Sequence, residues 1–166
     1  DTAELSFTDV FVPEANLIGG KEGLGFIQLM MNLPLERLSI GVAAAAAGEA
    51  AFDWTRDYVI SREAFGERVA DFQNTRFRLA DMATTVDVMW AYIDRAMELY
   101  KDQKLTAEEA AKVKFWATDR EAELLDVGVQ LHGGYGYITE YPIARAYLDA
   151  RVHRIYGCLL YTSDAA

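Results

Sequence analysis

Three long segments of this sequence repeat apolar residues at steps of three and four, which is the spacing of one face of an α-helix. These segments run from Gly25 to about Arg62, from about Gln73 to Gln103, and from Thr106 to about Leu131. A fourth, shorter helix is expected from Ile143 to about Arg154. In the second segment the repeating apolar residues are Phe77, Leu79, Met82, Val86, Met89, Ile93 and Met97. Long helices joined by short links predict an all-α fold, an up-and-down helical bundle.

The helix ends are marked by residues with specific backbone preferences. Thr106 and Glu109 form the Thr-x-x-Glu pattern of a capping box, so the third helix should begin directly after Thr106. Pro142 suits the first turn of the fourth helix, because the N–H that it lacks has no intrahelical partner there. Pro34 lies inside the first segment and removes one backbone hydrogen bond, so we expect two helices or a kink, with the second part starting near Leu33.

The start of the chain has a different pattern. Between Glu4 and Pro13, apolar and polar residues alternate and then give way to an apolar run that ends at proline. This pattern predicts a short N-terminal β-strand. A lone strand is not stable, so this strand should complete a sheet of a preceding domain. We therefore interpret residues 1–20 as the end of a β domain and residues 21–157 as a helical bundle domain.

Composition and charge exclude several functions. The formal net charge is −10, from 16 basic and 26 acidic residues, and such a chain repels nucleic acid and anionic lipid. No run of about 18 apolar residues is free of charges. Cys158 is the single cysteine, and neither His132 nor His153 has the partner spacing of a zinc or di-iron site. We expect no nucleic acid partner, no metal, and a soluble part of a longer protein.

Four places can carry chemistry, although each also has a structural explanation. Glu36 lies in the first turn after a proline, where the helix dipole favours a carboxylate. Arg62–Gly66 reads RxxFG, which is also an ordinary helix end. Glycines in Gln130–Tyr137 either permit positive φ or let backbone amides approach the phosphates of a cofactor. Gly41–Gly48 reads GVAAAAAG, whose small residues allow close approach of a ligand or, as we favour, of another helix.

Taken together, short strings of this chain resemble the acyl-CoA dehydrogenase family over about residues 4–157. No single string is decisive, but nine of them occur in the order and at the spacings of the family. The strings are FxDVxVP (Phe7–Pro13), NLIG (Asn16–Gly19), GxGF (Gly23–Phe26), LPxERL (Leu33–Leu38), RxAFG (Arg62–Gly66), LADM (Leu79–Met82), VQLHGGYGY (Val129–Tyr137), EYPI (Glu140–Ile143) and DARVxxIYG (Asp149–Gly157). The long-chain branch of the family is the most similar.

The resemblance implies the C-terminal bundle of a flavoprotein that is usually a homotetramer. Such oxidoreductases use FAD in fatty acid β-oxidation to convert acyl-CoA into trans-2-enoyl-CoA, and they pass electrons to electron transfer flavoprotein. The implied location is the cytoplasm of a bacterium or the mitochondrial matrix of a eukaryote. Most of the flavin-covering domain lies outside this sequence, so the fragment alone should be inactive. Residues 158–166 depart from the family pattern and are interpreted as a non-native tail.

The resemblance also implies roles for individual residues. Many members place the catalytic glutamate directly after Ile-Tyr, where this chain has Gly157, whereas a second branch places it in LxxERL, where this chain has Glu36. Glu36 is therefore the expected catalytic base. Arg37 matches a contact with CoA, and the N–H of Gly157 matches a donor to the thioester oxygen. The residues that match FAD contacts, partly across a subunit interface, are Arg62, Phe65, Gln73, Gln130, Gly133 and Gly134.

Two other interpretations remain at this point. The first is a related flavoenzyme, such as an acyl-CoA oxidase, whose reduced flavin reacts with O₂. The second is a non-catalytic helical assembly domain that has lost its cofactor. A pure scaffold has no physical need for Glu36, Arg62, Gln73 and Gln130 together, which favours an enzyme.

Overall fold

The computed structural model describes residues 3–157, and the chain divides into two compact units, residues 1–32 and residues 33–166. The described residues contain four α-helices: α1 (Gly25–Ser61), α2 (Gln73–Lys101), α3 (Ala107–His132) and α4 (Pro142–Ala150). The shorter elements are the 3-10 helices η1 (Glu14–Asn16), η2 (Val69–Asp71), η3 (Gly133–Tyr137) and η4 (Arg151–Arg154) and the strands β1 (Glu63–Ala64) and β2 (Glu67–Arg68).

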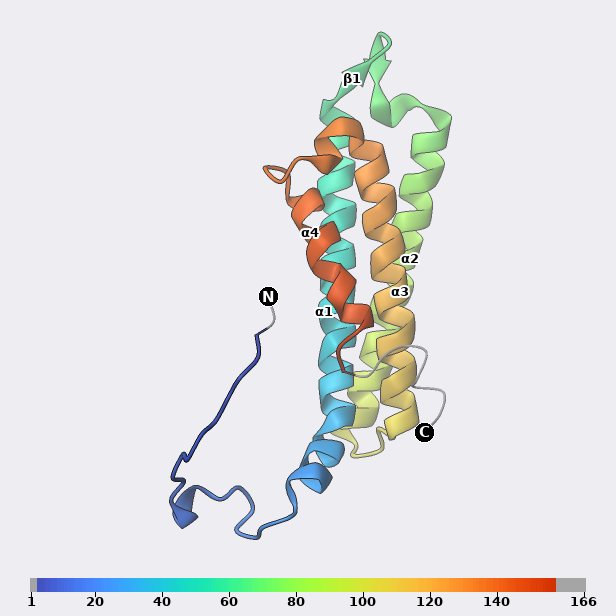
Figure 1. Cartoon of the computed structure of the whole chain (residues 1–166). Coiled ribbons are helices and arrows are strands. Elements are labelled where there is room, and N and C mark those ends of the chain that lie inside the picture. Colours follow the sequence, from blue (N-terminus) through green and yellow to red (C-terminus); the bar gives the residue numbers. More distant parts are fainter. Residues whose placement is uncertain (1–2, 158–166) are drawn as a thin grey trace. The chain divides into compact units, whose positions relative to one another are not determined.

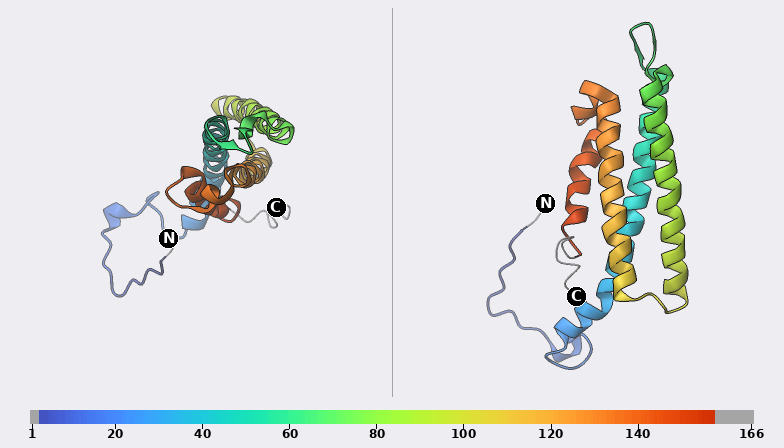
Figure 2. Two further views of the ribbon diagram at one scale, coloured as in Figure 1. Left: turned by 90° about the horizontal axis from the view of Figure 1, so that it is seen from above. Right: turned by 90° about the vertical axis from the view of Figure 1, so that its right-hand side faces the viewer.

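The second unit is the predicted bundle. From Leu33 onward, α1 is followed by α2, α3 and α4, and Figure 1 shows successive helices running in opposite directions. Figure 2 shows α4 on the side of α1 and α3 that faces away from α2. The all-α, up-and-down bundle is therefore confirmed.

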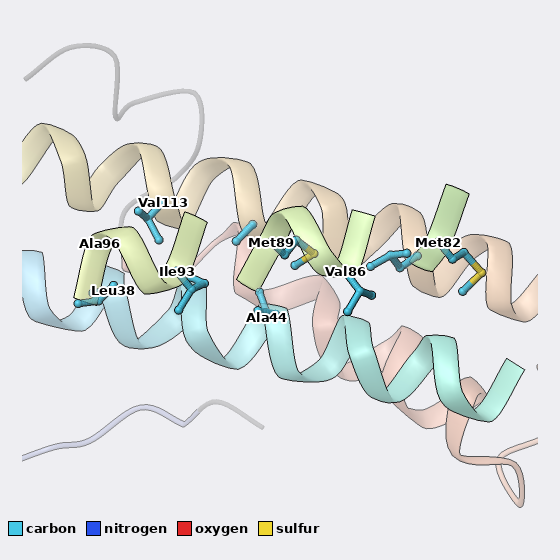
Figure 3. Close-up of a cluster of buried hydrophobic side chains, with 11 residues drawn as sticks. Leu38, Ala44, Met82, Val86, Met89, Ile93, Ala96 and Val113 are labelled. Carbon is cyan, nitrogen blue, oxygen red and sulfur yellow. The ribbon is translucent and has the colours of Figure 1, made fainter. Parts of the chain in front are cut away.

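The main core lies between α1, α2 and α3. Figure 3 shows Leu38 and Ala44 of α1 facing the α2 stripe and Val113 of α3. The buried apolar residues of α2 are Met82, Val86, Met89, Ile93 and Ala96. Of the predicted stripe, Phe77 and Met97 are instead exposed. At the C-terminal end of α2 the buried face includes Ala96 and not Met97. At the N-terminal end it includes Thr75, and Phe77, two residues later, lies about 200° further round the helix at 100° per residue, on nearly the opposite face.

The small residues of α1 allow close helix packing. Gly41, Ala44, Ala45 and Gly48 are all buried. A Cβ added to Gly41 would lie 2.6 Å from Cγ1 of Val113 on α3. One added to Gly48 would lie 2.8 Å from Cδ1 of Leu124, also on α3. This confirms the interpretation of GVAAAAAG as a helix-packing segment.

A second apolar cluster holds α4 in place. It contains Ala51 of α1, Leu125 of α3, and Ile143 and Ala150 of α4, all of them buried. Because these contacts pack α4 against α1 and α3, the segment that follows α4, including η4, also lies beside these two helices. The position of residues 151–157 thus depends on this cluster.

The helix ends follow the predicted signals with two differences. The Thr106 hydroxyl accepts a hydrogen bond from the Glu109 N–H at 3.2 Å, whereas the Glu109 carboxylate pairs with Lys112 at 3.1 Å. Pro142 occupies the first turn of α4, as expected. α1 continues through Pro34 as one element, so two separate helices are wrong, because the missing donor removes a single bond from a long helix.

The predicted N-terminal strand does not form within this chain. Residues 4–13 contain no strand, since a strand requires a hydrogen-bonded partner and none of residues 3–157 pairs with this segment, whose expected partner is the sheet of a preceding domain. The sheet of the described residues is instead a two-stranded hairpin of β1 and β2, which the sequence did not indicate to us. Phe65 (φ 56°) and Gly66 (φ 88°) form its two-residue turn, and positive φ at both positions is typical of a tight hairpin.

Candidate functional site

The first group of predicted site residues lies where α1 meets the segment after η4. Arg37 is 8% exposed, and its Nε donates a hydrogen bond to the Gly157 carbonyl at 3.2 Å. A Cβ placed on Gly157 would lie 3.9 Å from Oε1 of Glu36. The fold therefore brings together Glu36, Arg37 and Gly157, although 120 residues separate the two ends of the Arg37 hydrogen bond.

Gly157 has two constraints that favour glycine. Its φ is +63°, a backbone conformation that L side chains rarely adopt. A Cβ there would also lie 2.5 Å from Cδ1 of Ile40. Among the described residues, Glu36 supplies the one carboxylate within 4 Å of that Cβ position. The exposed Glu36 side chain thus places a carboxylate next to the space that a side chain at position 157 would occupy.

A buried ion-pairing group anchors the segment that carries Gly157. Glu121 on α3 is fully buried, and both of its carboxylate oxygens lie 2.9 Å from Nδ1 of His153 in η4. Burial raises the pKa of Glu121, and the hydrogen bond from His153 acts in the opposite direction. The His153 ring stacks on Tyr156 with centroids 5.5 Å apart and planes at 6°.

This anchor was not predicted from the sequence, where His153 was considered only as a metal ligand and Glu121 was not considered. A signal was present in the periodicity of α3. Glu121 falls between Ala117 and Leu124 on the face that the structure buries. A carboxylate in that register predicts a buried polar partner.

The second group of predicted site residues surrounds a hollow at the end of the bundle that carries the hairpin. Its volume is about 440 Å³. It is lined by Tyr58, Arg62, Val69, Gln130, Leu131, His132, Gly133, Gly134, Tyr135 and Ile138. The lining contains a guanidinium and no carboxylate, so the hollow favours an anionic ligand. Four of the six residues predicted to contact FAD are thereby brought together.

Backbone and ring contacts shape this hollow. Gly133 has φ 60° and ψ −138°, a combination available to glycine. The Arg62 guanidinium lies 5.7 Å from the centre of the Tyr135 ring. His132 is buried, stacks on Tyr58 at 4.2 Å and shares a 2.7 Å hydrogen bond with the Gly128 carbonyl through Nδ1. Burial lowers the pKa of His132, which favours the neutral ring.

Two predicted cofactor residues lie outside the hollow. Phe65 is 98% exposed at the hairpin turn, and Gln73 is exposed at the start of α2. Neither lines the hollow that contains Arg62. Within a single copy of the chain, these two residues and the hollow do not form one surface site.

Two further properties concern residues 3–157. No helix in that range is long and apolar enough to cross a membrane. No cluster of three or more His, Cys, Asp or Glu side chains in that range could hold a metal ion. Cys158 and the rest of the predicted tail, residues 158–166, lie outside the part of the chain that the structure describes.

Comparison with known proteins relates this chain to one family. The family model described as "Acyl-CoA dehydrogenase, C-terminal domain" matches residues 23–157. A long-chain specific acyl-CoA dehydrogenase, mitochondrial, from Sus scrofa is 46% identical over 157 residues, covering 95% of this chain and 36% of that protein. This chain therefore spans about a third of that relative's length.

Solved structures show the same relationship. An acyl-CoA dehydrogenase from Geobacillus kaustophilus superimposes with a TM-score of 0.90 at 42% identity, over 96% of this chain and 42% of that one. An acyl-CoA dehydrogenase from Bacillus anthracis, solved in complex with FAD, gives a TM-score of 0.80 at 27% identity, over 85% of this chain and 28% of that one.

Proposed function

Because this chain belongs to the acyl-CoA dehydrogenase family, we propose that it is the C-terminal part of an FAD-dependent enzyme that oxidises the Cα–Cβ bond of acyl-CoA thioesters. The product is trans-2-enoyl-CoA, and electrons pass to electron transfer flavoprotein. In this proposal residues 1–20 end a preceding β domain, and residues 21–157 form the bundle domain of a homotetramer. The location is the cytoplasm in a bacterium or the mitochondrial matrix in a eukaryote.

One observation carries the proposal: the Glu36 carboxylate lies beside Gly157. Removal of an α proton from a thioester requires a base near the α carbon and a donor near the thioester oxygen. Glu36 offers the base, and the N–H of Gly157 offers the donor. Their proximity across the fold supports the assignment of both to one reaction centre.

Arg37 has a second role that its position suggests. Its Nε donates a hydrogen bond of 3.2 Å to the carbonyl of Gly157, the same residue whose N–H is the proposed donor. Arg37 thus helps to orient the proposed donor. The contact of Arg37 with CoA stays a prediction. The guanidinium is buried and has N–H groups besides Nε that can donate to such a ligand.

The hollow around Arg62 fits the anionic part of the cofactor. Arg62, Gln130, Gly133 and Gly134 offer a cation, an amide and open backbone, which suit a pyrophosphate. Bound FAD supplies the acceptor for the β hydride. The exposed Phe65 and Gln73 suit contact with the cofactor of a neighbouring subunit, which agrees with a homotetramer.

The alternatives differ in measurable ways. An acyl-CoA oxidase would pass electrons from the reduced flavin to O₂ rather than to electron transfer flavoprotein. A non-catalytic assembly domain would belong to a protein that binds no FAD. The carboxylate beside Gly157 favours an enzyme over the assembly domain, whereas the electron acceptor is distinguished by oxygen consumption during turnover.

The decisive experiment replaces Glu36 with glutamine in the complete enzyme that carries this chain. Glu36→Gln keeps the side-chain volume but removes the proton acceptor, so flavin bleaching by acyl-CoA should slow by about 10²- to 10⁴-fold. The absorbance of the oxidised flavin should persist. Stopped-flow spectroscopy measures both.

Glu98→Gln is the matched control, because Glu98 is an exposed glutamate of α2 that belongs to neither group of site residues. This variant should reduce its flavin at the parent rate. A Glu36→Gln enzyme that also does so would show that the base lies elsewhere.

A further inference from the structure

Residues 151–157 carry the proposed thioester-binding donor outside any long helix. The segment consists of η4 and the three residues after it. Its own backbone bonds are short-range, from the N–H groups of Ile155 and Tyr156 to the Val152 carbonyl at 2.8 and 3.0 Å. Such a segment needs side-chain anchors to hold Gly157 in one orientation.

The deepest of these anchors is Glu121. A fully buried carboxylate is costly unless it is hydrogen-bonded, and His153 is the hydrogen-bond partner that the described residues give it. Both carboxylate oxygens lie 2.9 Å from Nδ1, and because an ionised carboxylate only accepts hydrogen bonds, Nδ1 carries the proton and donates when Glu121 is ionised. Glu121 therefore determines both the tautomer and the position of the His153 ring.

Tyr156 connects the Glu121–His153 pair to Gly157. The His153 ring lies nearly parallel to the Tyr156 ring, at 5.5 Å and 6°. Burial, and to a lesser extent the charge of Glu121, also raises the pKa of the Tyr156 hydroxyl. Gly157 follows directly and is held from the other side by Arg37.

We propose that His153, fixed by Glu121, is a positioning residue that orients the Gly157 N–H toward the thioester oxygen. This inference rests on the proposed function, because the donor matters only if a thioester binds there. His153 touches no reacting atom in this scheme. Its loss should impair the chemical step, because a misplacement of about 1 Å can cost about 10²-fold in rate.

The first test compares kinetic parameters in the complete enzyme. His153→Ala should lower kcat for flavin reduction by about 10- to 100-fold while KM changes little. His153→Gln retains an N–H for Glu121 and should recover much of the loss. Glu123→Gln is the matched control, since Glu123 is an exposed glutamate of the same helix, and it should match the parent.

The second test measures the hydrogen bond itself. In a Glu36→Gln background, which blocks turnover, infrared difference spectroscopy records the carbonyl stretch of bound acyl-CoA. A hydrogen bond from Gly157 should lower this frequency relative to free acyl-CoA, and the added His153→Ala change should move it back toward the free value. A purely structural role for His153 would lower stability and leave the frequency unchanged.

The outcomes separate the two proposals. If the parent enzyme does not reduce its flavin and the Glu36→Gln enzyme does not perturb the thioester carbonyl, the proposed function fails. If flavin reduction and the carbonyl shift are both present, and His153→Ala and Glu121→Gln leave kcat at the parent value and the carbonyl frequency at that of the Glu36→Gln enzyme, the positioning role alone is overturned. If His153→Ala does not fold, Glu121→Gln still decides, because it leaves only a neutral acceptor for His153 and should shift both readouts in the same direction.

Discussion

Gly128 tests whether close contact between three helices sets the stability of this bundle. It is buried on α3, facing α1 and α4. A Cβ there would lie 2.7 Å from Cδ1 of Ile143 and 2.9 Å from Oγ1 of Thr55. Neither neighbour retreats easily, because Ile143 is fully buried and the Thr55 hydroxyl donates a 2.7 Å hydrogen bond to the Ala51 carbonyl.

The expected loss follows from two opposing effects. Overpacking of a core costs about 1–3 kcal/mol, whereas alanine in a helix interior is about 1 kcal/mol better than glycine. Gly128→Ala should therefore lower the free energy of unfolding by about 1 kcal/mol. Ile143→Val removes Cδ1, the nearest atom, and alone should cost about 0.5–1.5 kcal/mol.

The double variant isolates the contact. With valine at position 143, Gly128→Ala should cost about 1 kcal/mol less than it does beside isoleucine, which is a favourable coupling energy. Urea unfolding followed by far-ultraviolet circular dichroism measures all four proteins. Gly134→Ala is the control, because no atom lies within 4 Å of its Cβ position. Equal costs of Gly128→Ala in the two backgrounds would refute the steric argument.

Two further predictions concern the hollow. Arg62→Ala in the complete enzyme should lower the flavin absorbance per subunit without loss of helicity, whereas Arg76→Ala, outside the hollow, should not; unchanged flavin content in Arg62→Ala would contradict its role. His132 has a pKa lowered by burial, so its contribution to stability is complete above its unfolded pKa of about 6.5 and declines as pH falls below it, by at most about 1.4 kcal/mol per pH unit. Unfolding midpoints between pH 7 and 5.5 should fall more steeply in the parent than in His132→Phe, and equal slopes would show that His132 does not titrate differently on folding.

Local features of the sequence were enough to predict the bundle. The repeats of three and four, the cap at Thr106 and the proline at the start of α4 depend on interactions between residues within one or two helical turns. They placed α2 to within two residues of its observed end at Lys101. They were less reliable at Phe77 and Met97, because periodicity alone does not say which edge of an apolar stripe meets a neighbouring helix.

The candidate site could be predicted in part. The resemblance between strings selected the residues, and the family comparison confirms the family itself. It did not indicate that Arg62, Gln130, Gly133 and Gly134 share a hollow while Phe65 and Gln73 lie apart from it. That division depends on which residues of one chain face the same space.

The tertiary structure alone decided the long-range contacts. Glu36 meets Gly157, and Glu121 meets His153, because α4 packs on α1 and α3 and returns the chain past them. The segment 4–13 forms no strand within the described residues for the complementary reason, since its hydrogen bonds were expected to come from the sheet of a preceding domain. Helices satisfy their backbone within a few residues and can be predicted from a short window, whereas strands and reaction centres depend on groups that only folding brings together.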